Sequence, residues 1–224
     1  MGAGGLARET AEAIAAVNEV CPTWRLRGLL DDDPRLLGSC VAGLPVLGPS
    51  EMVHELANVM VCICVASPTD PLRRSRVARR LDLPEERYGT VVHPNASLGG
   101  STSLGHGVVV LAGVVATADV RVGQHVVLMP QVVLTHDDEV ADGATCGAGV
   151  RLAGGVSVGS SAYLGSGCCV REGIRVGEGA VLAMGAVALA HVPAHETWGG
   201  VPAHRLSGSG AQSRRVATDA GGLT

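Results

Sequence analysis

The sequence contains no phenylalanine, two tryptophans and two tyrosines among its 224 residues. This scarcity excludes a core built on stacked aromatic rings. The formal net charge of −4 gives no basic surface for nucleic acid. No apolar run reaches the length of a membrane span, and the first residues do not read as a secretory signal. We therefore expect a cytoplasmic protein of one or two domains.

Seven cysteines are present, but none has the Cys/His spacing of a zinc site. Cys62 and Cys64 alternate within an apolar stretch, and Cys146 and Cys168 follow the pattern of interior positions described below. Because cytosolic chains seldom carry disulfides, we expect reduced, structural thiols and no metal.

A period of six residues dominates the chain from Val92 onward. Each unit opens with an aliphatic or small residue, and its fifth position is nearly always small or apolar. The openers are Val92, Leu98, Leu104, Val110, Ala116, Val122, Leu128, Leu134, Val140, Cys146, Leu152, Val158, Leu164, Val170, Val176, Leu182 and Ala188. A fixed period of this kind predicts stacked coils, each covering the one before. The predicted fold of this region is a parallel β-helix.

Glycine recurs at the second and fourth positions of these units, as at Gly99, Gly105, Gly107 and Gly113. These positions are the expected corners of each coil, where a residue without Cβ turns easily. The abundance of glycine and the lack of large rings both fit a narrow coil interior.

Residues 1–82 lack the period and alternate helical and apolar extended stretches, which predicts a small Rossmann-like α/β domain. We expect helices over 8–14, 50–57 and 72–83 and strands over 25–30 and 59–66. A linker over 83–91 leads to the β-helix at 92–206. The composition of 207–224 predicts a disordered tail. A first strand ahead of the glycine-rich loop is missing, so either the true start lies upstream or the sheet has lost a strand.

The run Gly2-Ala3-Gly4-Gly5 opens the first predicted helix, and Asp31-Asp32-Asp33 follows the first predicted strand. Backbone N–H groups at a helix start can hold phosphates, and carboxylates at a strand end can bind ribose hydroxyls. The two motifs together suggest a nucleotide or nucleotide-sugar pocket. The alternative is a tight turn beside a solvated acidic loop.

Seven segments in their order resemble the sugar O- and N-acyltransferases of the left-handed β-helix (hexapeptide-repeat) superfamily, the NeuD/PglD-like group. They are Gly2-Ala3-Gly4-Gly5, Leu30-Asp31-Asp32-Asp33-Pro34, Pro45-Val46-Leu47-Gly48, His93-Pro94-Asn95-Ala96, Thr135-His136-Asp137, Leu152-Ala153-Gly154-Gly155-Val156 and Gly200-Val201-Pro202-Ala203. The resemblance implies a left-handed coil, a homotrimer, acetyl-CoA as cosubstrate in a groove between neighbouring coils, and a sugar acceptor, often nucleotide-linked, on the first domain.

Acyl transfer from a thioester needs a general base, and imidazole serves near neutral pH. The resemblance places the catalytic histidine at His136 and its supporting carboxylate at Asp137, with direct attack on the thioester. The alternative is a surface histidine on a coil corner. Asp138 follows at a fifth position, where a buried carboxylate is unfavourable unless paired. It is expected to distort the coil or to join the site.

By the same resemblance, the cofactor-binding residues are Thr145, Gly154, Gly155, Ser166 and Met184. Arg205, Arg171 and Arg175 are candidates for the CoA phosphates because guanidinium geometry suits phosphate, and the alternative is a solvated surface charge. The substrate-binding residues are Gly4, Gly5, Leu6, Asp31, Asp32 and Gly48. Thr145 and Leu6 stand where relatives have histidines, and Met129 stands where relatives often have asparagine. These departures point to a changed acceptor or to lost activity.

The sequence thus predicts a CoA-dependent acyltransferase that modifies an amine or hydroxyl of a sugar or sugar-like small molecule. Two alternatives stay open. One is an acyltransferase acting on an amino-acid or natural-product intermediate. The other is a catalytically silent hexapeptide-repeat protein that binds a partner or ligand.

Overall fold

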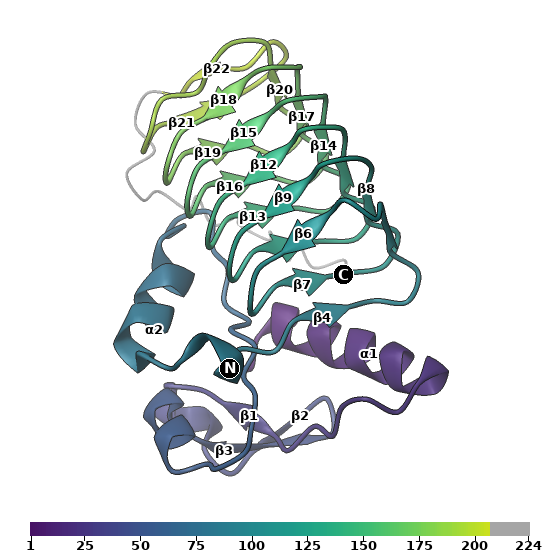
Figure 1. Ribbon diagram of the computed structural model, residues 1–224. Helices are drawn as coiled ribbons and strands as arrows, with labels where there is room; N and C mark the ends of the chain where they lie inside the picture. Colours follow the sequence, from purple (N-terminus) through teal and green to yellow (C-terminus); the bar gives the residue numbers. More distant parts are fainter. Residues whose placement is uncertain (207–224) are drawn as a thin grey trace, which may run out of the picture.

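A computed structural model describes residues 1–206 and shows two joined parts (Figure 1). A small α/β domain forms one end of the molecule, and a column of triangular coils rises from it. The predicted fold class, a Rossmann-like domain followed by a left-handed β-helix, is confirmed. The tail expected at 207–224 lies outside the described residues.

Three parallel sheets form the sides of the column, and each strand pairs with the strand eighteen residues further on, as Val127 does with Thr145. Face 1 holds β4 (Val91–Val92), β7 (Val109–Val110), β10 (Val127–Leu128), β13 (Thr145–Cys146), β16 (Tyr163–Leu164), β19 (Val181–Leu182), β21 (Thr197–Gly199) and the antiparallel β22 (His204–Arg205). Face 2 holds β5 (Ser97–Leu98), β8 (Val115–Ala116), β11 (Val133–Leu134), β14 (Arg151–Leu152), β17 (Cys169–Val170) and β20 (Val187–Ala188). Face 3 holds β6 (Ser103–Leu104), β9 (Arg121–Val122), β12 (Glu139–Val140), β15 (Ser157–Val158) and β18 (Arg175–Val176).

The periodic residues fill the interior of the column. Openers such as Leu128, Leu134 and Cys146 are fully buried, and so are fifth-position residues such as Val132 and Val150. The glycines lie at the corners of the coils, as their positions predict. Fourth-position glycines adopt positive φ, and a Cβ at Gly99, a second position, would lie 1.7 Å from a carbonyl oxygen of the next coil. The repeat therefore determines both the core and the corners.

The first domain contains α1 (Gly5–Val20), α2 (Arg73–Leu81) and a three-stranded sheet. The sheet consists of β1 (Leu29–Leu30), β2 (Cys40–Val41) and β3 (Leu44–Gly48), with β1 and β3 parallel and β2 antiparallel. Short 3₁₀ helices span Pro34–Leu36, Ser50–His54 and Glu85–Arg87. The predicted helices at 8–14 and 72–83 are confirmed, and the one at 50–57 is a 3₁₀ helix.

The prediction of a strand over 59–66 is wrong, because this segment forms no ladder with another strand. The strand predicted over 25–30 is confined to β1. The segment 59–66 makes a single bridge, Val61 with Tyr88. The reason is that Met1 and Gly2 lie between the two segments, in the place of the expected first strand. Met1 N donates to Cys62 O at 2.6 Å, and Gly2 N donates to Leu30 O at 2.7 Å. Beside them lies a largely apolar cavity of about 410 Å³, between 24–30 and 58–62.

Both helices of the first domain contact the column. Ala13 and Ile14 of α1 pack on Val91, Val109 and Val127, the outward residues of face 1. Along α2, Ser75 Oγ lies 2.6 Å from Ser161 Oγ. The residues expected to be a linker, 83–91, contribute Tyr88 to the same junction, where its ring meets the edge of His125. Face 1 is therefore covered by the first domain over its lower coils.

Candidate active site

His136 lies on the corner between β11 of face 2 and β12 of face 3. Its Nδ1 is 2.8 Å from Oδ2 of Asp137, and both side chains are about two-thirds exposed, at 69% and 66%. Asp137 has a φ of +62°, the left-handed conformation that most corners adopt at this position. When Nδ1–H donates to the carboxylate, Nε2 is left as an available base.

The imidazole of His136 lies over Gly154, which occupies the same corner position one coil further on. A Cβ built on Gly154 would be 2.3 Å from Cε1 and 2.4 Å from Nε2 of the ring. The main chains of the two coils are also in contact here, because Gly155 N donates to His136 O at 2.9 Å. Gly154 is predicted to bind the cofactor, and in the structure the ring of the predicted base packs against it.

Asp138 is completely buried beneath this corner. Its Oδ1 accepts from Val156 N at 2.8 Å, and its Oδ2 accepts from Thr135 N at 2.7 Å. Burial raises the pKa of the Asp138 carboxyl to about 6, against the opposing effect of these hydrogen bonds. The strand pairing of β12 on both sides stays in register, so the expected distortion of the coil does not occur.

The other predicted cofactor residues lie on several corners. Gly155 is on the His136 corner one coil above His136, and Arg171 is on the same corner one coil above Gly155. Ser166 and Met184 are exposed on the corner between faces 1 and 2. Arg205, on β22, pairs with Glu196 at 3.3 Å. Arg175 lines an open groove on face 3. One chain therefore brings Gly154 and Gly155 to His136, while Ser166 and Met184 lie across face 2 from it.

Thr145 is almost fully buried under α2, and its Oγ1 accepts from Arg74 Nη2 at 2.8 Å. Arg74 is itself 2% exposed and also donates to four main-chain carbonyls, those of Val65 (3.0 Å), His125 (2.9 Å), Gly143 (3.4 Å) and Ala144 (3.2 Å). Burial lowers the pKa of its guanidinium to about 10. In the single chain, Thr145 thus joins the two domains through Arg74, a partner that no sequence pattern indicates.

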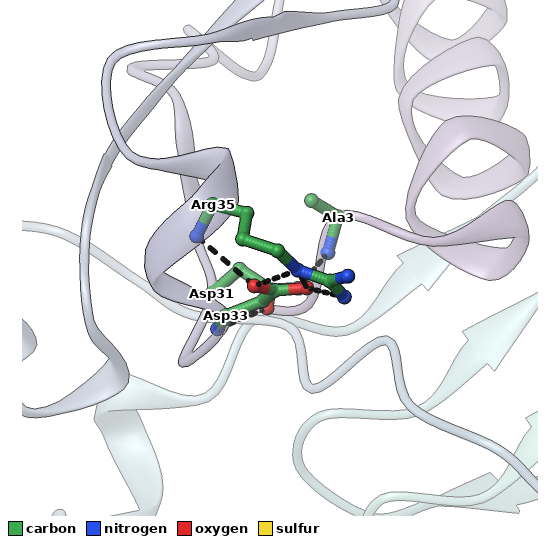
Figure 2. A network of polar contacts seen from close by, with 4 residues as sticks. All are labelled: Ala3, Asp31, Asp33 and Arg35. Carbon is green, nitrogen blue, oxygen red and sulfur yellow. Dashed lines mark hydrogen bonds and ion pairs between the residues drawn. The ribbon is translucent and has the colours of Figure 1, made fainter.

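The acidic cluster of the first domain is organised by backbone donors. Asp31 accepts from Ala3 N at 2.7 Å and from Asp33 N at 2.9 Å, which ties the glycine-rich loop to the end of β1, and Asp33 holds Arg35 (Figure 2). Asp32 accepts from Ser50 N and pairs with Arg80, each at 2.8 Å. Burial opposes ionisation of Asp32, but these hydrogen bonds outweigh it and lower its pKa to about 2.

A cavity of about 630 Å³ opens beside this cluster. Asp31 and Asp32 line one side, while Gly4, Gly5, Leu6 and Gly48 do not. Its other wall is an arginine face of α2, formed by Arg73, Arg76 and Arg80. These arginines are not among the residues predicted to bind the substrate. Their spacing of three and four residues puts them on one side of a helix, and that signal could have found them.

The remaining histidines differ in setting. His93 accepts from Asn95 N at 3.0 Å, which fixes the first turn. His125 is buried against Tyr88, and burial lowers the pKa of its imidazole. Among residues 1–206, no three His, Cys, Asp or Glu side chains gather as metal ligands, and no helix is long and apolar enough to cross a membrane.

Solved structures show the same architecture. The perosamine N-acetyltransferase of Caulobacter crescentus, a point mutant in complex with CoA and GDP-perosamine, superposes with a TM-score of 0.80 at 28% identity over 92% of this chain and 94% of that one. This chain belongs by fold to the left-handed β-helix superfamily. The predicted resemblance to its sugar acyltransferases is confirmed.

Two further structures extend the comparison. The acetyltransferase domain of PglB from Neisseria gonorrhoeae, in complex with acetyl coenzyme A, has a TM-score of 0.81 at 27% identity, covering 92% of this chain and 96% of that one. WeeI from Acinetobacter baumannii has a TM-score of 0.77 at 24% identity, covering 92% and 97%, and shares the fold. No protein-family model and no curated protein matches the sequence.

Proposed function

We propose that this chain transfers an acyl group, most simply acetyl, from CoA to the amine of a nucleotide-linked sugar. The observation that carries the proposal is the exposed His136–Asp137 pair at 2.8 Å, seated on Gly154. Two solved proteins of this fold, 27–28% identical to the chain, were captured with CoA and GDP-perosamine or with acetyl coenzyme A. A sugar amine is therefore favoured over the hydroxyl, amino-acid and scaffold alternatives.

The proposed reaction is direct. Nε2 of His136 accepts a proton from the acceptor amine as the amine nitrogen attacks the thioester carbonyl carbon. The C–S bond then breaks, and the CoA thiolate leaves and takes up a proton. Asp137, next to Nδ1, stabilises the imidazolium that forms. The buried cysteines play no part as nucleophiles, because burial raises the pKa of the Cys168 thiol to about 12.

The nucleotide is assigned to the cavity between the acidic cluster and the arginine face of α2. Guanidinium groups suit a diphosphate, and carboxylates suit ribose hydroxyls. Arg76 and Arg80 already pair with Asp70 and Asp32, whereas Arg73 has no carboxylate partner among the described residues. Arg73 is thus the group most available to a phosphate.

A homotrimer is part of the proposal. Ser166 and Met184 lie across face 2 from His136, so one chain does not gather all of the predicted CoA contacts. Outward residues of face 2, among them Val115, Val133 and Val187, form a half-buried apolar row. A neighbouring copy that covers this row would bring a second corner toward His136.

The test measures thiol release from acetyl-CoA with GDP-perosamine and UDP-linked amino sugars as acceptors. We expect turnover in the wild type and a loss of about 10²–10⁴-fold in His136→Ala, the range for a general base. Binding of GDP or UDP is followed separately by thermal shift, because a ligand of the folded state raises the melting temperature. Arg73→Glu should abolish that shift, while the exposed Arg79→Glu on the same helix should keep it. Turnover in His136→Ala equal to the wild type would overturn the proposal.

A further inference from the structure

Asp138 is the one charged side chain at its position in the coils. The same position one coil earlier is Val120, and in the following coils it is Val156, Ile174 and Val192, all buried apolar residues. Asp138 is no more exposed than they are, and no ion pair joins it to a residue of the described chain. A buried carboxylate without a cation opposes folding, so its presence here calls for a compensating role.

One oxygen of Asp138 changes the hydrogen bonding of the turn that carries His136. In the coils on either side, the corresponding N–H bonds to the next coil, with Thr117 N to Leu134 O at 3.1 Å and Ala153 N to Val170 O at 3.0 Å. Thr135 N instead donates to Asp138 Oδ2 at 2.7 Å. Leu152 O, left by that N–H, accepts from Thr135 Oγ1 at 3.1 Å. The carboxylate therefore secures the residue just before His136.

The other oxygen secures the opposite side of the same contact. Asp138 Oδ1 accepts from Val156 N at 2.8 Å, and Val156 directly follows the Gly154–Gly155 turn on which the imidazole lies. In the coil above, the equivalent Ile174 N makes an ordinary turn bond, to Arg171 O at 3.3 Å. A single carboxylate thus holds the residues flanking both members of the His136–Gly154 pair.

We propose that Asp138 is a positioning residue that fixes the His136 turn over Gly154 and thereby sets the position of the catalytic base. The inference rests on the proposed function of His136. The inference predicts opposite changes in the stability of the fold and the rate of the reaction, two quantities that normally fall together. An apolar residue at this position suits the column, and so it should stabilise the fold. Loss of the two hydrogen bonds frees the turn, and so it should slow the reaction.

The experiment compares Asp138→Val and Asp138→Asn with Ile174→Val, a conservative change at the same position two coils further on. Melting temperature is measured together with kcat and KM for acetyl-CoA, with GDP-perosamine as the acceptor probe. We expect Asp138→Val to raise the melting temperature by about 3–6 °C and to lower kcat by about 10–100-fold with KM little changed, because a small misplacement of a reacting group has this effect. Asp138→Asn, whose amide can accept only one of the two bonds, should have an intermediate kcat.

A kcat within twofold of the wild type in Asp138→Val would overturn the inference. So would a fall in melting temperature that parallels the fall in kcat, because that result indicates a structural role alone. If the wild type does not turn over the probe, the His136 ring resonances in NMR spectra decide instead. Asp138→Val should shift or broaden them relative to Ile174→Val, and unchanged ring resonances would overturn the inference independently of the acyltransferase proposal.

Discussion

The imidazole of His136 occupies the space that a side chain would need on Gly154, the residue at the same corner of the next coil. The contact leaves no space for a methyl group, which would lie 2.3 Å from Cε1 of the ring. The two residues are brought together by the stacking of coils, and their spacing follows from the repeat. A base whose position depends on a glycine in another coil gives the first prediction.

Gly154→Ala should displace the imidazole and lower kcat/KM for acyl transfer by about 10–100-fold, because the added Cβ and the ring cannot occupy the same space. The melting temperature should change little, since Gly154 has no positive φ and the ring can swing into solvent. The measurement is steady-state thiol release together with a thermal melt.

Gly100→Ala is the matched control. Gly100 occupies the same corner position three coils before Gly154, and a Cβ there meets no atom within 4 Å. This variant should keep wild-type activity. Equal activity in Gly154→Ala and Gly100→Ala would show that the ring does not need its seat on Gly154.

Asp137→Asn should have a modest effect, a loss of up to about 5-fold in kcat. The carboxylate and the imidazole are both exposed, and exposed ion pairs are worth roughly 0.2–1 kcal/mol. The measurement is steady-state thiol release with the same acceptor. A loss beyond about 100-fold would mean that Asp137 contacts a reactant rather than supporting His136.

Asp138 should make the fold less stable as the pH rises. Its pKa is about 6 in the folded chain and near 4 in an unfolded one, so the folded state retains a proton that the unfolded state loses. The stabilisation is fully present below pH 4 and lost as the pH passes 6. It amounts to on the order of 2–3 kcal/mol.

The measurement is the difference in unfolding free energy between the wild type and Asp138→Val at pH 4, 5, 6 and 7, which cancels most other groups. His136, Asp137 and Cys146 are the titratable neighbours of Asp138, and they remain in the variant. A flat difference across this range would mean that Asp138 is ionised throughout.

Arg74→Ala should destabilise the protein by about 2–4 kcal/mol. The change leaves Thr145 Oγ1 and the carbonyls of Val65, His125 and Gly143 without this donor, while Ala144 O keeps its bond from Val127 N. Thermal unfolding should show the loss and a separation of the two domains into distinct transitions. Arg79→Ala, an exposed change on the same helix, should leave the melting curve as it is.

Much of this structure follows from the sequence because most of it repeats. Each opener, such as Leu134 or Leu152, meets the same neighbours in every coil, so one period predicts the core, the corners and the place of His136. The first domain has no such redundancy. The short β1 and the near-absence of ladder pairing over 59–66 depend on Met1 and Gly2 standing between them, which no local propensity reports.

The candidate site divides in the same way. His136 and Asp137 are adjacent in the chain and were predicted from their motif, whereas the seat on Gly154 appears once the coils are stacked. The contact between Arg74 and Thr145 joins positions 71 residues apart in the sequence, one in the first domain and one in the column. No pattern in either segment indicates the other. Resemblance could therefore assign Thr145 to the cofactor site, but the contact with Arg74 could not be predicted.

Helix α2 carries Arg73 and Arg76 toward the cavity of the first domain and, between them, Arg74 into the wall of the column. Arg74 thus joins the helix that lines the proposed nucleotide cavity to the coils next to His136. If that cavity holds the diphosphate as proposed, acceptors are selected by the span between their phosphates and their reactive nitrogen.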